Sequence, residues 1–108
     1  MESYVQVITT TDKKEDADRI ARSLVEARLV ACVQIIGPIE STYWWKANIE
    51  TAREWLCLMK TNKNLYDELE KAIKAMHPYE TPEIIAMPIV AGSSEYLEWL
   101  GNEIKRQP

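Results

Sequence analysis

One short segment, HPYETPE at residues 77–83, combines the only histidine with two prolines and two glutamates. Imidazole and carboxylate groups bind divalent metal ions and transfer protons. Each proline fixes φ at about −65° and keeps the preceding residue out of helical space. The segment, called the proline loop below, is therefore predicted to hold His77, Tyr79, Glu80 and Glu83 in fixed directions. A simple boundary between a helix and a strand is the plainer alternative.

Acid–base catalysis is one use that such a loop can have. His77 lies within a few residues of Glu80 and Glu83, and a histidine beside a carboxylate can act as an acid–base pair. The sequence offers no nucleophile elbow, phosphate-binding loop or zinc motif to accompany that pair. Because a histidine beside a proline turn is more often structural, we expect that the protein is not an enzyme.

Length and composition indicate one soluble domain over residues 1–108. The net charge is −4, and the basic residues are dispersed among glutamates, so we expect no nucleic-acid partner. No apolar run approaches the roughly 20 residues of a membrane helix, and no signal-like region precedes the first strand pattern. These features predict a cytoplasmic protein without a membrane partner. Cys32 and Cys57 are then most simply small buried apolar residues.

Apolar periodicity predicts a ferredoxin-like α+β sandwich. Strands are expected at residues 4–9, 29–45, 49–59 and 84–90, and helices are expected to open at Asp12, at Asn62 or Asn64, and at residues 92–94. The order is βαββαβ with an additional C-terminal helix, which makes the first and third strands central. The unbroken apolar run at residues 55–59 suits a central strand covered on both faces. Pro38 and Pro88 fall on the two predicted edge strands, where proline is tolerated.

The second and third strands form a hairpin that is longer than a small sheet requires. Its tip carries Tyr43, Trp44 and Trp45, followed by a turn near Ala47 and Asn48. Adjacent tryptophans point to opposite faces of a strand, so one must point away from its own sheet. An isolated aromatic hairpin is marginal in water and open to edge pairing. We therefore predict a homo-oligomer closed by pairing of edge strands.

Several separated blocks carry a resemblance to the divalent-cation-tolerance family called CutA. They are LVACVQI at residues 29–35, STYWWK at 41–46, IE at 49–50, Glu54, KT at 60–61, HPYETPEI at 77–84, and Tyr96, Leu97 and Trp99. The resemblance implies a ferredoxin-like fold, a tight homotrimer with PII-like architecture, and a link to tolerance of copper and other divalent cations. The family usually has glycine where Ala47 stands. If that turn needs positive φ, either Ala47 is strained by about 1 kcal/mol or the turn moves to Asn48.

For a metal, the candidate ligands are His77, Cys32, Glu80 and Glu83, with Cys57 as the second thiol. Copper(II) prefers imidazole and oxygen ligands, and copper(I) prefers thiolate. A hairpin turn at residues 47–48 would place Cys57 opposite Pro38, far from Cys32. With one histidine and no compact spacing, a copper site is expected to assemble between subunits or to bind weakly at the surface.

A PII-like sensor cleft is the alternative function. Lys60 ends a central strand, and Thr61 and Asn62 precede a predicted helix N-terminus, where anions are attracted. With Tyr43 and Trp45 from a neighbouring hairpin, and with Tyr79, they would line an inter-subunit cleft for a small ligand, read by a protein partner. The plainer interpretation is that Lys60 pairs with Glu54 or Glu83. A structural protein without any ligand is the third possibility.

Overall fold

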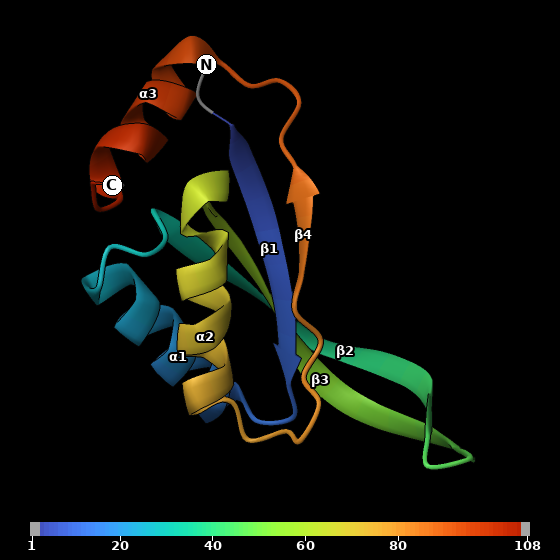
Figure 1. Cartoon of the computed structure of the whole chain (residues 1–108). Coiled ribbons are helices and arrows are strands. Elements are labelled where there is room, and N and C mark those ends of the chain that lie inside the picture. The colour runs from blue at the N-terminus through green and yellow to red at the C-terminus, as the bar shows by residue number, and fades with distance from the viewer. Residues whose placement is uncertain (1–2, 107–108) are drawn as a thin grey trace.

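The computed structural model describes residues 3–106 and shows one antiparallel sheet with helices on one side (Figure 1). The elements are β1 Tyr4–Thr11, α1 Lys14–Glu26, β2 Cys32–Trp45, β3 Asn48–Asn62, a 3₁₀ turn Lys63–Leu65, α2 Tyr66–Met76, β4 Ile85–Pro88 and α3 Ser94–Glu103. The strand order is β2-β3-β1-β4, with every pair antiparallel. The predicted ferredoxin-like order, its central strands β1 and β3 and its additional C-terminal helix are confirmed.

Both prolines lie on edge strands, as predicted. Gly37 and Pro38 together oppose Trp55, because the β2–β3 register shifts between Ile36 and Ile39. Two residues opposite one form a β-bulge, which tolerates a proline without an N–H group. On the other edge, β4 is shorter than the predicted strand 84–90 and ends at Pro88.

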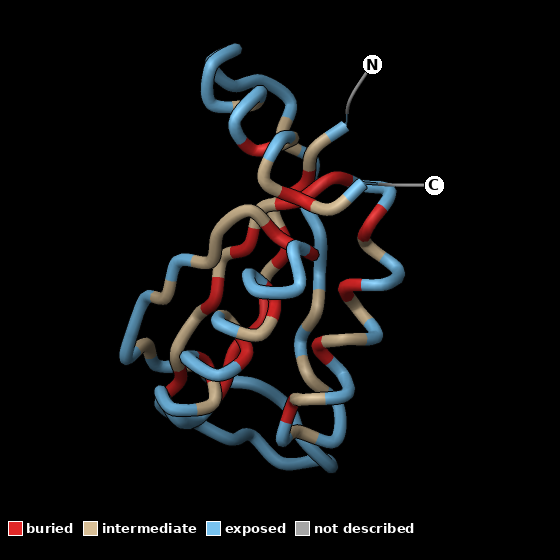
Figure 2. The backbone as a smooth tube through the Cα atoms, turned by 90° about the vertical axis from the view of Figure 1, so that its left-hand side faces the viewer, coloured by how far each residue is buried: buried red, intermediate tan, exposed pale blue. Residues whose placement is uncertain are grey.

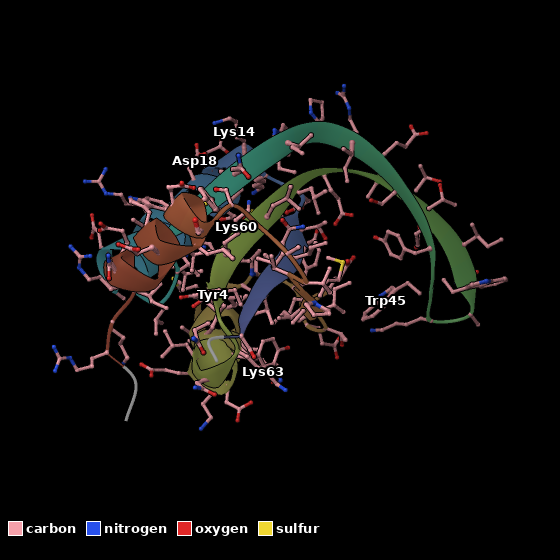
Figure 3. All side chains as sticks on the ribbon, turned by 90° about the horizontal axis from the view of Figure 1, so that it is seen from above. Tyr4, Lys14, Asp18, Trp45, Lys60 and Lys63 are labelled. Carbon is pink, nitrogen blue, oxygen red and sulfur yellow. The ribbon has the colours of Figure 1, made fainter. Side chains whose placement is uncertain are left out.

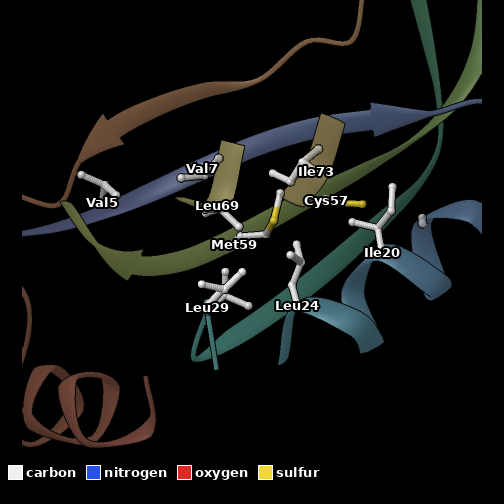
Figure 4. Packing of buried hydrophobic residues seen from close by; sticks show 11 residues of the cluster. Val5, Val7, Ile20, Leu24, Leu29, Cys57, Met59, Leu69 and Ile73 are labelled. Atoms are coloured by element: carbon white, nitrogen blue, oxygen red, sulfur yellow. The ribbon is translucent and has the colours of Figure 1, made fainter. Parts of the chain in front are cut away.

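The core lies between the sheet and the two helices that cover it. One face of α1 and one face of α2 carry the buried positions, which alternate with exposed ones along each helix (Figure 2). Ile20 and Leu24 of α1 and Leu69 and Ile73 of α2 belong to one apolar cluster with β1 and β3 (Figure 4). That 3.6-residue spacing is what makes these two segments amphipathic helices.

The expectation that residues 55–59 would be covered on both faces does not hold within the single chain. Cys57 and Met59 are fully buried, whereas Leu56 and Leu58 between them are only partly buried. Side chains of a strand alternate between faces, and α1 and α2 lie on one face only. The strand is central in the sheet, but its other face stays open in the single chain.

The predicted position of Cys57 in the hairpin is also wrong. Cys57 pairs with Ile35 rather than with Pro38. The turn is centred one residue earlier than expected, which moves the residue opposite Cys57 two positions toward the N-terminus. The bulge moves it one position further. Since Cys32 pairs with Lys60, three positions beyond Cys57, the two thiols point to opposite faces. The conclusion that the cysteines form no joint site within one hairpin is unchanged.

The helix starts differ partly from the prediction. Asp12 does not cap α1: its N-cap residue is Lys13, which makes no side-chain capping bond. Asn62 does act as a cap, but for the short 3₁₀ turn that precedes α2. Ser93 caps α3, where its hydroxyl accepts a hydrogen bond from the N–H group of Tyr96 at 3.2 Å. None of the helices in the described part of the chain is long and apolar enough to cross a membrane.

The hairpin turn is built from two residues in the left-handed region. Lys46 has φ of 49° and Ala47 has φ of 67°. Positive φ at both central residues is the geometry of the two-residue turn that best suits the twist of a hairpin. The alternative turn through Asn48 is therefore excluded, and Ala47 carries the strain.

Replacing Ala47 with glycine is expected to raise the free energy of unfolding by about 1 kcal/mol, because glycine has no Cβ to clash at positive φ. Urea unfolding followed by circular dichroism measures the difference. Ala52→Gly, at an ordinary position of β3, is the matched control and should lower stability by about 0.5–1 kcal/mol. Equal effects of the two substitutions would contradict the assignment of strain to the turn.

Candidate functional site

A groove of about 820 Å³ lies between the β2–β3 hairpin and the proline loop. The hairpin curves strongly as it leaves the sheet, and Trp45 lies on the inner side of that curve (Figure 3). The lining residues are Thr10, Ser41, Thr42, Tyr43, Trp44, Trp45, Glu54, Tyr79, Glu80, Thr81, Pro82 and Glu83. Two segments identified from the sequence, the aromatic hairpin tip and the proline loop, therefore form one concave surface.

Strand alternation places three of the lining side chains on the same face. Glu54 pairs with Ile39, so it shares its face with every second residue of β2 beyond that point. Tyr43 and Trp45 are two such residues. This is the face that α1 and α2 leave open.

His77 holds the proline loop against β1. Its side chain is buried, and its Nε2 atom lies 2.8 Å from the carbonyl oxygen of Thr10. Its Nδ1 atom accepts a hydrogen bond from the N–H group of Tyr79 at 3.1 Å. These two bonds together define a neutral ring that carries its proton on Nε2. Burial favours the neutral form and lowers the pKa of His77.

Both ring nitrogens of His77 are therefore already in use. A metal ion would need the Nδ1 lone pair that accepts the N–H group of Tyr79. The rings of His77 and Tyr79 are also in contact, with centroids 4.7 Å apart. In the single chain, His77 is a structural residue that orients Tyr79.

Tyr79 joins the proline loop to β3 through a buried carboxylate. Its phenol donates a hydrogen bond of 2.6 Å to Oε2 of Glu54. Glu54 is only 5% exposed, although its side chain ends in a carboxyl group. Burial and the neighbouring carboxylate raise the pKa of Tyr79, so its hydroxyl stays protonated and donates.

Glu54 is the residue that site prediction from the sequence missed. It lies within the long hairpin, with no motif of its own beyond a single position of the family pattern. The alternation of β3 relative to the aromatic tip contains the relevant signal. The face of Glu54 can be compared with that of the aromatic tip only when the β2–β3 pairing is known, and the bulge at Gly37 and Pro38 shifts that pairing.

A cation from the chain itself lies beside two of the residues that line the groove. The Nζ atom of Lys46 lies 5.5 Å from the ring centroid of Trp45 and 3.9 Å from Oε2 of Glu80. Lys46 and Glu80 are largely exposed, so the ion pair contributes little to stability. The arrangement shows that the aromatic and acidic wall accommodates an ammonium group.

The four candidate metal ligands are not brought together within one chain. His77, Glu80 and Glu83 lie in the proline loop, whereas Cys32 begins β2, where its Sγ atom is 3.8 Å from the hydroxyl of Tyr96. Residues 3–106 contain no group of three or more histidine, cysteine, aspartate and glutamate side chains arranged to hold a metal ion. The inter-subunit copper site therefore stays a prediction.

The five residues of the predicted cleft divide into two groups. Tyr43, Trp45 and Tyr79 line the groove. Lys60 instead donates a hydrogen bond from Nζ to Oε1 of Gln34 at 2.7 Å, so its predicted pairing with Glu54 or Glu83 is wrong.

Thr61 is fully buried, and its hydroxyl donates to the carbonyl oxygen of Leu29 at 2.7 Å. Neither Lys60 nor Thr61 lines the groove of its own subunit. Their meeting with a neighbouring copy's hairpin stays a prediction.

Comparison with known proteins assigns the family. The model of the CutA1 divalent ion tolerance protein family matches residues 5–103. The divalent-cation tolerance protein CutA of Thermus thermophilus is 44% identical over 94 residues, which cover 87% of this chain and 91% of that protein. The chloroplastic protein CutA 1 of Oryza sativa is 43% identical over 101 residues. That match covers 94% of this chain, which spans only 57% of the Oryza protein's length.

A solved structure agrees with these relatives. The crystal structure of CutA1 from Oryza sativa superposes with a TM-score of 0.94 at 41% identity, covering 97% of this chain and 96% of that chain. The likeness thus extends over both the sheet and the long hairpin that forms the groove. This chain belongs to the CutA1 divalent ion tolerance protein family.

Proposed function

We propose that this protein acts in divalent-cation tolerance as a cytoplasmic, non-enzymatic homotrimer that binds copper or another divalent cation. Membership of the CutA1 family is the observation that carries the proposal. The candidate donors Cys32, His77, Glu80 and Glu83 are too dispersed for a site within one chain, so the cation would bind where copies meet. The two hydrogen bonds of His77 support a structural role over acid–base catalysis.

The open face of the sheet supports assembly. Five large apolar side chains on this face are between 36% and 50% exposed: Ile36, Tyr43, Trp45, Ile85 and Met87. A soluble monomer rarely leaves this many large apolar side chains of one sheet face open to water. We infer that neighbouring copies cover it and form a closed ring with PII-like architecture.

Trp45→Lys is expected to reduce the trimer to monomer or to aggregate, because it removes the indole that the neighbouring copy would cover. Size-exclusion chromatography with light scattering measures the mass. Lys71→Ala, on the exposed side of α2, is the control and should keep the wild-type mass. An unchanged trimer mass for Trp45→Lys would place the contact elsewhere.

Calorimetric titration with copper(II) tests the metal site. We expect saturable heat with the wild-type protein and at least about tenfold weaker binding after Glu83→Gln, since that substitution removes an oxygen donor. Electron paramagnetic resonance of the copper(II) complex then shows whether the nitrogen of His77 is a ligand. The absence of saturable heat with the assembled protein would contradict metal binding.

The remaining parts of the proposal rest on composition and on the thiols. Cys32 and Cys57 are free, as is usual in a reducing compartment. The net charge of −4 argues against a nucleic-acid partner. The alternative function, a PII-like sensor of a small anion, gains nothing from the single-chain geometry, because Lys60 lies outside the groove.

A further inference from the structure

We propose that the groove between the hairpin and the proline loop binds a small organic cation, a primary ammonium ion, on the carboxylate of Glu54. This binding activity goes beyond a role in metal tolerance and uses none of the proposed metal ligands as its primary contact. Three features of the groove support the inference: a buried carboxylate that forms no ion pair with the described residues, aromatic walls, and an acidic lining.

Glu54 is the first feature. A carboxylate that is 5% exposed is costly to bury unless a cation or several donors compensate its charge. Tyr79 supplies one donor to Oε2, and no ion pair joins Glu54 to a lysine or arginine within residues 3–106. Glu54 nevertheless lines the groove, so a ligand that enters can reach it. A primary ammonium group carries the missing charge and three N–H donors.

The aromatic residues are the second feature. Tyr43 and Trp45 share the face of Glu54 and line the same groove. Aromatic rings attract cations through their negatively polarised faces, especially where water is partly excluded. The chain already shows this contact, because the ammonium group of Lys46 lies over Trp45 and reaches toward Glu80.

The lining charges are the third feature, and their sign within the single chain is negative. Glu54, Glu80 and Glu83 line the groove, whereas no lysine or arginine of residues 3–106 does so. The field inside therefore favours a cation and disfavours a phosphate or carboxylate ligand. Among cations, the groove suits an organic one, since no three donors are arranged for a metal in the described residues and the walls are partly aromatic.

Titration with n-butylammonium tests the inference, with n-butanol as the neutral probe of similar size. Backbone amide NMR shifts and tryptophan fluorescence of the complete protein, in low salt at neutral pH, report binding. Butylammonium carries a full charge under these conditions, like a lysine side chain. We expect saturable shifts of the groove residues with butylammonium and at least tenfold weaker binding of butanol.

Two substitutions should change the affinity in opposite directions. Glu54→Gln keeps the size of the side chain and an acceptor for Tyr79 but removes the charge, so binding should weaken at least about tenfold. Lys46→Met removes the competing ammonium group from Trp45 and should tighten binding a few fold. Glu15→Gln removes an equal charge from the exposed side of α1 and is the control for net charge.

Equal binding of butanol and butylammonium, or an unchanged affinity in Glu54→Gln, would overturn the proposal. So would the absence of saturable shifts in both the wild-type protein and Lys46→Met. Copper titration and mass measurement on the same samples keep the two proposals separate. We expect Glu54→Gln to lose ammonium binding while copper binding and trimer mass stay at their wild-type values.

Discussion

Leu24→Ala is expected to lower the free energy of unfolding by about 2–5 kcal/mol. Leu24 is 1% exposed and projects from α1 into the cluster between the helices and the sheet (Figure 4). The substitution removes the transfer free energy of the lost methyl and methylene groups and leaves a cavity that packed neighbours fill only partly. For a domain of this size, this is a large fraction of the total stability.

Val25→Ala is the matched control for this prediction. Val25 is the next residue of α1, and it is 40% exposed. Alanine has the higher helix propensity, so the loss of a half-exposed side chain should change stability by less than about 0.5 kcal/mol. Urea unfolding of both variants measures the difference. An equal slope of the free energy of unfolding against urea concentration in the two variants checks that only stability has changed. Similar losses in the two variants would contradict the packing of α1 described above.

Periodicity was sufficient for the fold because burial in this chain follows regular alternation. The sequence alone predicts the helix face containing Ile20 and Leu24 and the edge positions of Pro38 and Pro88. It does not predict the end of β4 at Pro88 or the position of Cys57. Both depend on which residues pair across strands. In the hairpin, one bulge shifts the partner of each residue between it and the sheet end of the strands by one position.

The site was predictable only in part for the same reason. The proline loop and the aromatic tip were recognised because unusual residues are concentrated there. Their meeting in one groove depends on the curvature of the hairpin, which periodicity does not encode (Figure 3). Glu54 became a site residue because alternation aligns it with Tyr43. Within the single chain, Lys60 bonds Gln34 and lies outside the groove, so its place in a cleft between subunits stays a prediction.

The groove and the open sheet face also connect the two proposals. Trp45 belongs to both surfaces, since it lines the groove and lies among the exposed apolar residues of that face. A neighbouring copy that covers the face would further exclude water from the groove. Charge interactions with Glu54 strengthen as water is removed. Assembly and ligand binding are therefore expected to favour each other, as linkage requires when a ligand prefers the assembled state.

His77→Ala is expected to lower the free energy of unfolding by about 2–4 kcal/mol at pH 7.5. Two hydrogen bonds, to the carbonyl of Thr10 and from the N–H group of Tyr79, are lost, and the buried ring leaves a cavity. The carbonyl group of Thr10 and the N–H group of Tyr79 are then left without their hydrogen-bond partner where water has limited access, which adds to the loss of stability. His77→Gln, which can still donate to Thr10, should lose less.

The same variants have a distinct pH dependence. Burial lowers the pKa of His77 in the folded protein, even though the Thr10 carbonyl and the carboxylates of Asp16, Asp12 and Glu54 act in the opposite direction. The unfolded chain therefore binds the proton more readily than the folded one. The stability that neutral His77 contributes is complete above a pH of about 6.5 and is lost progressively as pH falls below that value.

Because the sequence contains a single histidine, the interval between about pH 5.5 and 7.5 isolates this residue. The stability of the wild-type protein should fall across the interval as pH decreases, while that of His77→Ala and His77→Gln should stay nearly level. The difference between wild type and variants should accordingly shrink toward acid pH. Urea unfolding at matched ionic strength measures it. If the stability difference between wild type and variants were independent of pH, the folded protein would tolerate a charged imidazole ring. The two hydrogen bonds that hold the proline loop would then not require neutral His77.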